Sequence, residues 1–330
     1  MKNRRIEWTH GRDIISLQKI ARCVGAAWIT FSLIALQGLA AAAVPQKAFE
    51  SPARAAQAMV DALRKDNRQE LLEIFGEESK GLLNSGDPME DKSSIHTFLK
   101  SYDQMHRFSR GPSGRLFLIV GAENWPLPIP LKKEPAGWYF DTRYGKEEML
   151  FQRIGANELS AIRILNAIVV GEHEYYEQTH DNGVTKAYAQ KIVSDEGTHD
   201  GLYWKTAAGE PESPIGPLVA QASQEGYRVS SGTPIPVRGY YFRLLTSQGK
   251  NAADGARDYV VDGKMTGGFA VLAYPASYRS SGVMTFLADA KGNILQKDLG
   301  PKSSVLAGGM GGYDPDESWN IVNEAQPDMP

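Results

Sequence analysis

The residues best suited to acid–base chemistry are His199 and Asp200, which lie beside two aromatic residues in one short segment. An imidazole next to a carboxylate can move protons in a hydrolytic reaction, provided that a cleft brings both groups to a substrate. The alternative interpretation is that Asp200-Gly201 forms a turn and that Tyr203 and Trp204 anchor a loop, since aromatic side chains dominate core burial. We prefer the second interpretation and assign no catalytic residue.

The densest cluster of candidate metal ligands is His173, Glu174, Glu177 and His180. On a helix His173 and Glu177 share a face, but the spacing differs from the H-E-x-x-H pattern of zinc proteases. Polar side chains at a solvated helix end explain the cluster better. The sequence also lacks the patterns of a P-loop and of a G-x-S-x-G nucleophile elbow. We therefore expect neither a bound metal nor a cofactor.

Aromatic residues in turn-rich segments are better candidates for recognition. Trp125 is the first of them, because prolines at positions 126, 128 and 130 stiffen the segment after it and remove backbone donors at alternate positions. An edge strand of this kind cannot recruit another strand, and an aromatic ring at its start suits a binding groove. The alternative is that these rings hold the two halves of the molecule together. The candidate binding residues are Trp125, Tyr203, Trp204, Tyr240 and Tyr241.

The elements that position these residues fall into two halves, 44–155 and 156–330. In the first half, Pro52 and Pro88 occupy the first position of two predicted helices, and a helix between them ends at Gly76. The predicted strands that follow cover 116–120, 127–131 and 138–140. Helices followed by antiparallel strands are typical of an α+β fold, such as the cystatin-like and nuclear-transport-factor-like folds.

The second half repeats this order of elements. Apolar residues at helical spacing predict a helix over 157–176, and a shorter helix ends at Gly226. The predicted strands cover 240–245, 269–274, 283–288 and 294–297. One long helix followed by an antiparallel sheet resembles the globular part of type IV pilins and pseudopilins. A prepilin keeps its apolar segment as a polymerising helix, so we do not expect a pilus subunit.

The first 43 residues have the pattern of an export signal. A basic segment precedes an apolar run over 24–39, and four alanines at 40–43 follow it. The alternative is an uncleaved anchor, because the apolar run approaches the length that spans a bilayer. The alanines provide the small residues that a signal peptidase requires, so cleavage after Ala43 is favoured. We therefore expect a periplasmic or secreted protein without stable membrane insertion.

Charge and cysteine content agree with export. The only cysteine, Cys23, precedes the apolar run, so the mature chain is free of cysteine and has no disulfide or thiol chemistry. Cleavage removes six of the 36 basic and two of the 39 acidic residues, which changes the net charge from −3 to −7. Such a chain is unsuited to a nucleic-acid partner, whose binding depends on neutralising phosphates.

Several stretches of sequence resemble a known family. They are residues 124–130, 137–142, 153–159, 200–204, 216–220, 239–243, 281–286 and 296–301. Together they look like a bacterial exported family catalogued as domain of unknown function 2950, over about residues 49–319. The resemblance implies a location in the cell envelope and one architecture across the mature chain. It implies no catalytic residues, because the family has no established activity.

These observations predict an exported bacterial envelope protein that binds a small ligand or another envelope protein without catalysis. The alternative is a periplasmic hydrolase-like enzyme with a site near His199 and Asp200. A pocket lined by aromatic residues would favour binding. A concave pocket in which His199, Asp200 and another titratable residue converge would favour the enzyme.

The export signal gives a first testable prediction. Because small residues follow the apolar run, the mature N-terminus is expected close to Val44. N-terminal sequencing of the protein from the envelope fraction measures it. A full-length chain that stays with the membrane after carbonate washing would show that the segment is an anchor.

Overall fold

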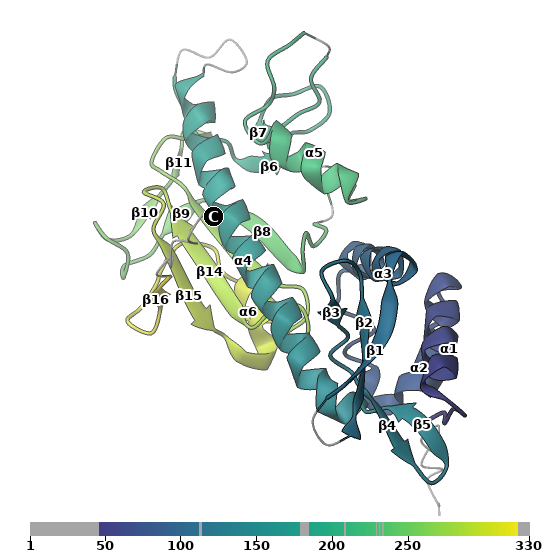
Figure 1. The fold of residues 1–330 in the computed structure, drawn as a ribbon. Helices are drawn as coiled ribbons and strands as arrows, with labels where there is room; N and C mark the ends of the chain where they lie inside the picture. Colours follow the sequence, from purple (N-terminus) through teal and green to yellow (C-terminus); the bar gives the residue numbers. More distant parts are fainter. Residues whose placement is uncertain are drawn as a thin grey trace, which may run out of the picture. The chain divides into compact units, whose positions relative to one another are not determined.

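The computed structural model describes residues 46–111, 114–178, 185–207, 209–228, 230, 232 and 234–322. The signal segment expected at 1–43 lies outside these residues, as does His180 of the candidate metal cluster. The described part of the chain has an α+β fold, as the sequence predicts. Helices come first and are followed by an antiparallel sheet, and a long helix then leads to a second antiparallel sheet (Figure 1).

The helices of the first half begin where their capping residues predict. Ser51 accepts a hydrogen bond from the amide of Arg54 at 3.2 Å, and Asp87 accepts from the amides of Met89 and Glu90, both at 3.1 Å. Such caps satisfy amides that the first turn of a helix leaves unpaired. The elements are α1 (Pro52–Arg64), α2 (Arg68–Phe75), η1 (Glu77–Ser79) and α3 (Pro88–Gln104).

The first sheet has the order β1-β2-β4-β5, and β3 pairs with β2. Its strands are β1 (His106–Arg110), β2 (Leu116–Val120), β3 (Trp125–Pro126), β4 (Leu131–Glu134) and β5 (Gly137–Phe140). The single strand expected over 127–131 is wrong, because β3 ends at Pro126 and β4 begins at Leu131. Between them the Leu127 amide still donates to Leu118 O of β2 at 2.8 Å, but Pro128 and Pro130 have no amide hydrogen to donate. Strand β1 was not predicted, because its mostly polar residues show no apolar alternation.

Helices and sheet of this half share the first core. Its buried side chains include Met59, Ile74, Leu118, Leu131 and Phe140. The apolar stripe predicted for the first helix supplies part of it, since Ala56, Met59 and Val60 are all buried. Burial of these side chains, rather than helix propensity alone, stabilises helices as short as α2.

Helix α4 (Thr142–Glu177) has 36 residues, so it is about 54 Å long. The expected start at residue 157 is wrong. Half of residues 143–156 are exposed, and their charged residues and glycines interrupt the apolar stripe on which the prediction depended. Met149 and Leu150 nevertheless pack against the first core, whereas Leu165 and Ile168 belong to the second. The expected boundary between residues 155 and 156 falls inside this helix.

Among the described residues, α4 is the one helix long and apolar enough to cross a membrane by length and composition. Packing accounts for its apolar face, since Ala161, Leu165, Ile168 and Val169 are buried against the second sheet.

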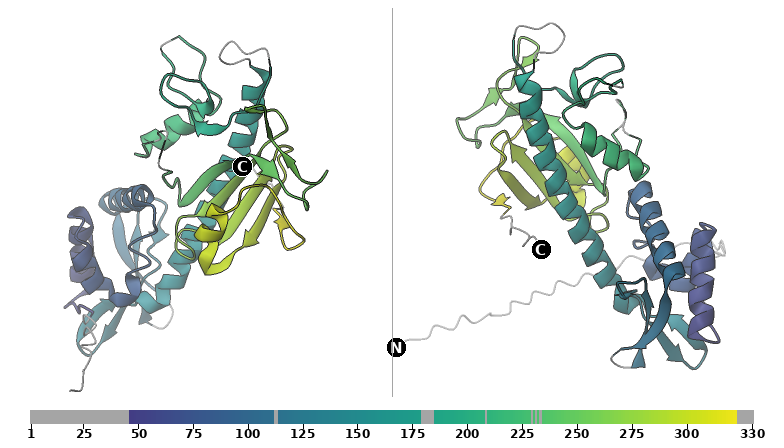
Figure 2. Two further views of the ribbon diagram at one scale, coloured as in Figure 1. Left: turned by 180° about the vertical axis from the view of Figure 1, so that it is seen from behind. Right: turned by 45° about the horizontal axis from the view of Figure 1, so that its top comes forward.

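The second sheet has the antiparallel order β16-β15-β14-β13-β8. Its strands are β8 (Tyr240–Leu245), β13 (Ala270–Pro275), β14 (Met284–Asp289), β15 (Ile294–Asp298) and β16 (Asn320–Ile321). The four predicted strands are therefore confirmed to within one residue, and β16 is added at the edge. Helix α4 covers one face of the sheet and α6 (Ser303–Gly308) the other (Figures 1 and 2).

Shorter elements surround this sheet. A parallel pair, β6 (Lys191–Val193) and β7 (Gly201–Tyr203), lies beside α4, and α5 (Gly216–Gln224) follows it. The remaining elements are β9 (Ser247–Gln248), β10 (Arg257–Asp258), β11 (Val260–Val261), β12 (Lys264–Met265) and η3 (Gly300–Lys302). The second core contains Leu165, Ile168, Tyr240, Val271 and Phe286, all nearly inaccessible to solvent.

Two glycines of α4 give a matched pair of variants. A Cβ at Gly145 would lie 2.3 Å from Pro128 O and 2.6 Å from Ile129 Cα, whereas a Cβ at Gly155 would meet nothing within 4 Å. We expect Gly145→Ala to lower the free energy of unfolding by about 1–3 kcal/mol through overpacking. Gly155→Ala should raise it by roughly 0.5–1 kcal/mol through helix propensity. Urea denaturation measures both, and equal effects would refute the close packing at Gly145.

Candidate functional site

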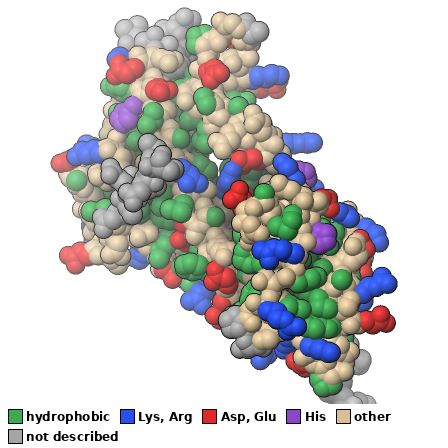
Figure 3. All heavy atoms as spheres, viewed as in Figure 1, with side chains coloured by type: hydrophobic (Ala, Val, Ile, Leu, Met, Phe, Trp, Pro, Cys, Tyr) green, Lys and Arg blue, Asp and Glu red, His purple; other side chains and the backbone are tan. Residues whose placement is uncertain are grey.

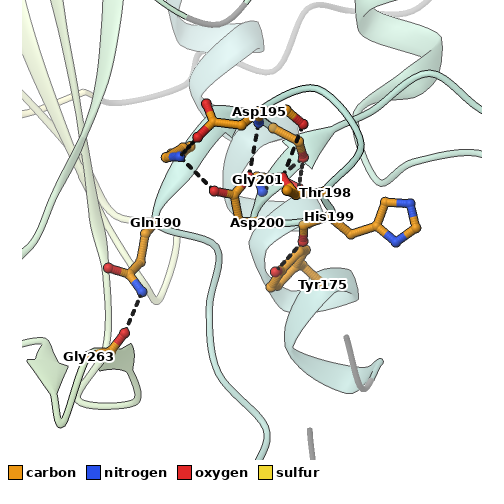
Figure 4. A network of polar contacts seen from close by, with 10 residues as sticks. Tyr175, Gln190, Asp195, Thr198, His199, Asp200, Gly201 and Gly263 are labelled. Atoms are coloured by element: carbon orange, nitrogen blue, oxygen red, sulfur yellow. Dashed lines mark hydrogen bonds and ion pairs between the residues drawn. The ribbon is translucent and has the colours of Figure 1, made fainter. Parts of the chain in front are cut away.

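The segment that the sequence singled out forms a compact loop between β6 and β7 (Figure 4). The carboxylate of Asp200 organises it. Its oxygens accept hydrogen bonds from Lys191 Nζ at 2.6 Å, from the Asp195 amide at 3.0 Å and from Thr198 Oγ1 at 2.7 Å. Ser194 Oγ adds a bond from the Gly201 amide at 3.0 Å. Asp200 therefore closes the loop, as an Asp side chain does in many turns.

These contacts decide the charge of Asp200. Partial burial alone would raise the pKa of the carboxyl, but the hydrogen bonds from Lys191, Thr198 and the Asp195 amide outweigh it and lower the pKa to about 2. The group is ionised at neutral pH, and three donors surround it. A general acid needs instead a pKa near the pH at which the enzyme works, so that it is partly protonated there.

The imidazole of His199 points away from the Asp200 carboxylate (Figure 4). It lies against the indole of Trp204, with ring centroids 4.5 Å apart and planes 37° apart. Tyr175 of α4 supports the pair, because its hydroxyl donates to the His199 carbonyl at 2.6 Å and its ring meets Trp204 edge to face. We call the rings of His199 and Trp204 the aromatic patch. His199 is exposed and Trp204 half-buried.

The structure does not assemble the five aromatic candidates into one site. Tyr203 and Trp204 lie together, half-buried against the second core. Trp125 is 40% exposed on β3, in the first sheet. Tyr240 is fully buried and donates its hydroxyl to Met284 O at 2.9 Å.

Tyr241 faces the other side of the same strand. Its ring stacks on Tyr274 of the neighbouring strand, with centroids 5.3 Å apart. The alternation of side chains along a strand separates Tyr240 from Tyr241, and the sequence pattern did not decide which of the two is buried.

The sequence did not reveal a junction of ionisable side chains around Asp87. Asp87, which is 1% exposed, accepts hydrogen bonds from Tyr227 Oη and from the Gly239 amide, both at 2.9 Å, besides capping α3. Arg238 forms a two-pronged ion pair with Glu225, one prong at 3.0 Å. The capping role of Asp87-Pro88 is readable from sequence, but its partners more than 130 residues away are not.

Burial decides the pKa values in this junction. It raises the pKa of Glu90, which the neighbouring Arg238 only partly offsets. It also raises the pKa of the Tyr227 hydroxyl, which stays neutral and donates to Asp87. Perturbed pKa values occur both at active sites and in structural networks. Here Asp87 receives four donors and Glu225 pairs with Arg238, so we interpret the junction as a structural connection.

The residues that the structure describes contain no group of three or more His, Cys, Asp or Glu side chains that could hold a metal ion. His173 and Glu177, from the candidate cluster, have other partners. The ring Nε2 of His173 donates to Ala290 O at 2.8 Å, and Glu177 pairs with Lys186.

A cavity of about 440 Å³ lies at the start of α4. Its lining includes Gln46, Phe75, Lys132, Phe140, Asp141 and Arg143. Its charged groups are already paired, Arg143 with Glu78 and Asp141 with Arg115, both at 3.0 Å. None of the site residues predicted from the sequence lines this cavity.

Residues 46–322 match the sequence model of a family described as "Protein of unknown function (DUF2950)". This match confirms the family resemblance seen in the sequence. No curated protein and no solved structure matches the chain. The likeness to pilins and pseudopilins therefore stays a resemblance in the order of elements.

The role of Asp200 is testable through its pH dependence. Its pKa falls from an ordinary value of 3.8 to about 2, so its stabilising contribution is present above pH 3.8 and is lost as the pH falls through 2. Asp200→Asn should lower the free energy of unfolding at pH 7 by up to about 1 kcal/mol, since the pair with Lys191 is partly exposed. The difference from wild type should shrink between pH 4 and pH 2. Urea midpoints measure it, with Asp195→Asn as the control that keeps the central carboxylate.

Proposed function

The chain belongs to this family of proteins of unknown function, and we propose that it is an exported envelope protein that binds a ligand or a protein partner without catalysis. The observation that carries the proposal is the aromatic patch. An exposed imidazole lies against a half-buried indole on a loop that Asp200 closes and Tyr175 attaches to α4. A surface held in place in this way loses little conformational entropy when it binds.

The chemistry of the patch supports recognition. Aromatic side chains supply a large contact area with few rotatable bonds, which is why Tyr and Trp are frequent at binding surfaces. The support is rigid, because Tyr175 is a buried residue of α4. A ligand or partner would meet rings carried on a backbone that the Tyr175 and Asp200 hydrogen bonds hold in place.

Export is supported by residues 1–43. Their basic start, apolar run and alanines have the order of a cleaved signal peptide, and the proposed mature chain has no cysteine. We accordingly propose a periplasmic or secreted location, without stable insertion in the membrane.

The proposed partner is not a nucleic acid. The expected mature chain carries a net charge of −7. On the face shown in Figure 3, Lys and Arg side chains are interspersed with Asp, Glu and hydrophobic side chains. Phosphate binding favours a contiguous basic surface instead.

The alternative, a periplasmic hydrolase-like enzyme at His199 and Asp200, has less support. It needs the imidazole and the carboxylate to face one reacting group. The Asp200 carboxylate is instead held by Lys191, Thr198 and the Asp195 amide, and the imidazole points the other way (Figure 4).

A binding experiment with three variants tests the proposal. The purified protein would be immobilised and exposed to envelope extract and to a library of envelope small molecules. His199→Ala removes an exposed ring and should leave the unfolding midpoint nearly unchanged, yet weaken capture at least about tenfold, the effect of losing roughly 1.4 kcal/mol. Trp204→Leu, which keeps an apolar group against the core, should weaken it similarly.

Trp125→Ala is the matched control, because this ring is partly exposed but lies on the first sheet. This substitution should lower the free energy of unfolding by less than the roughly 3–5 kcal/mol that truncation of a fully buried aromatic side chain costs. Should Trp125→Ala alone abolish capture, the recognition surface is the proline-rich strand and the aromatic patch is not the site.

A further inference from the structure

Glu172 is a carboxyl group buried in the second half of α4. The whole residue is inaccessible to solvent, with an exposed fraction of 0%. One oxygen, Oε2, accepts a hydrogen bond from the Ala189 amide at 2.9 Å. The other, Oε1, has no hydrogen-bond partner among the residues that the structure describes. An unsatisfied buried oxygen is uncommon in folded proteins and calls for an explanation.

The surroundings of Glu172 favour its neutral form. Burial raises the pKa of this carboxyl well above its ordinary value of 4.5, and the single bond from Ala189 offsets burial only in part. The titratable and charged groups near Glu172 on α4 are His173, Glu174, Tyr175, Tyr176 and Glu177. The facing segment carries Lys186, Tyr188 and Lys191, β12 carries Lys264, and the β14–β15 hairpin carries Asp289 and Lys291. None of these groups forms an ion pair with Glu172.

The Ala189 amide belongs to a segment, residues 185–193, that also contacts α4 through side chains. Lys186 pairs with Glu177 and lies over the ring of Tyr176, and Tyr188 meets His173 edge to face. Tyr188 stacks on Tyr176 with centroids 4.5 Å apart and packs on Phe269 at 4.8 Å. The Tyr188 amide donates to Met265 O at 2.8 Å. The bond from Ala189 to Glu172 is the one described hydrogen bond that joins the backbone of this segment to a buried side chain of α4.

The same segment leads directly to the aromatic patch. Its Lys191 holds the Asp200 carboxylate, and Tyr175, one turn after Glu172 on α4, holds the His199 carbonyl. A change in the attachment of residues 185–193 to α4 therefore reaches both supports of the loop.

We propose that Glu172 is a proton-dependent latch, which holds residues 185–193 against α4 while its carboxyl is neutral and releases them when it ionises. The consequence for binding, closure of the aromatic patch at low pH and loosening at high pH, rests on the proposed function. The attachment of residues 185–193 by Glu172 does not rest on the proposed function.

The physical reason is the cost of a buried charge without a partner. An ionised Glu172 would gain no ion pair and would leave Oε1 unsolvated, so the segment must open and let water reach the carboxylate. The open state has an ordinary pKa near 4.5 and the closed state a higher one. The latch is therefore fully stable below pH 4.5 and weakens as the pH rises through the closed-state pKa, by about tenfold in the opening equilibrium per pH unit.

Amide hydrogen exchange of the purified protein tests the latch. Base-catalysed exchange through an opening that releases no proton rises about tenfold per pH unit, so the logarithm of the rate has a slope of about 1. If opening releases the Glu172 proton, the slope at Ala189 should be about 2 above pH 5, and should return to about 1 above the closed-state pKa.

Two variants separate the latch from other causes. Glu172→Gln keeps an acceptor for the Ala189 amide but does not titrate, so its slope should be about 1 throughout. Glu174→Gln changes an exposed neighbour on α4 and should keep the wild-type slope. Amides of β13 report global unfolding and should exchange more slowly than Ala189 over the whole range.

A slope of about 1 at Ala189 in the wild-type protein overturns the proposal, and this outcome can be read even if Glu172→Gln fails to fold. Exchange of Ala189 at the same rate as the β13 amides also overturns it, since opening would then be global. Loss of binding by His199→Ala tests the patch and leaves the latch unaffected. If exchange at Ala189 has the expected pH dependence but the binding experiment captures no partner, the proposed function is refuted and the latch is not.

Discussion

The structure depends on one continuous helix that contributes to two hydrophobic cores. The first turns of α4 place Met149 and Leu150 against the first core, and Leu165 and Ile168 are buried in the second. The apolar side chains that α4 buries therefore lie against different cores at different points along its 36 residues. Its last turns carry Glu172 and Tyr175, which hold the loops around the aromatic patch.

A single carboxylate adds a second connection between the two halves. Asp87 caps α3 and also binds Tyr227 and Gly239, so every donor around it is satisfied while the group stays buried. Loss of such an acceptor leaves several buried donors unpaired, which costs more than a single hydrogen bond contributes.

Two carboxyl groups that bind residues 185–193, Glu172 through Ala189 and Asp200 through Lys191, have opposite electrostatic environments. Asp200 is surrounded by donors, which stabilise its charge and lower its pKa. Glu172 has one donor and an apolar environment, which favours its neutral form and raises its pKa. The first group gives the loop a fixed shape at neutral pH, and the second makes the attachment of the neighbouring segment depend on a proton.

Local signals in the sequence predicted the fold class, the family, the helices of the first half and the four long strands of the second sheet. Helix boundaries such as Pro52, Gly76 and Asp87-Pro88 and the continuous apolar runs of β13 and β14 depend on neighbouring residues alone. The sequence did not predict the length of α4, because the charged residues and glycines of 143–156 interrupt the apolar stripe. It singled out His199, Asp200 and Trp204, but the contact of His199 with Trp204 and the bond of Asp200 with Lys191 depend on how the chain folds in space. The burial of Tyr240 and Glu172 depends on packing against residues distant in the chain, and so do the long-range partners of Asp87. Spacing along one sequence carries no record of such contacts.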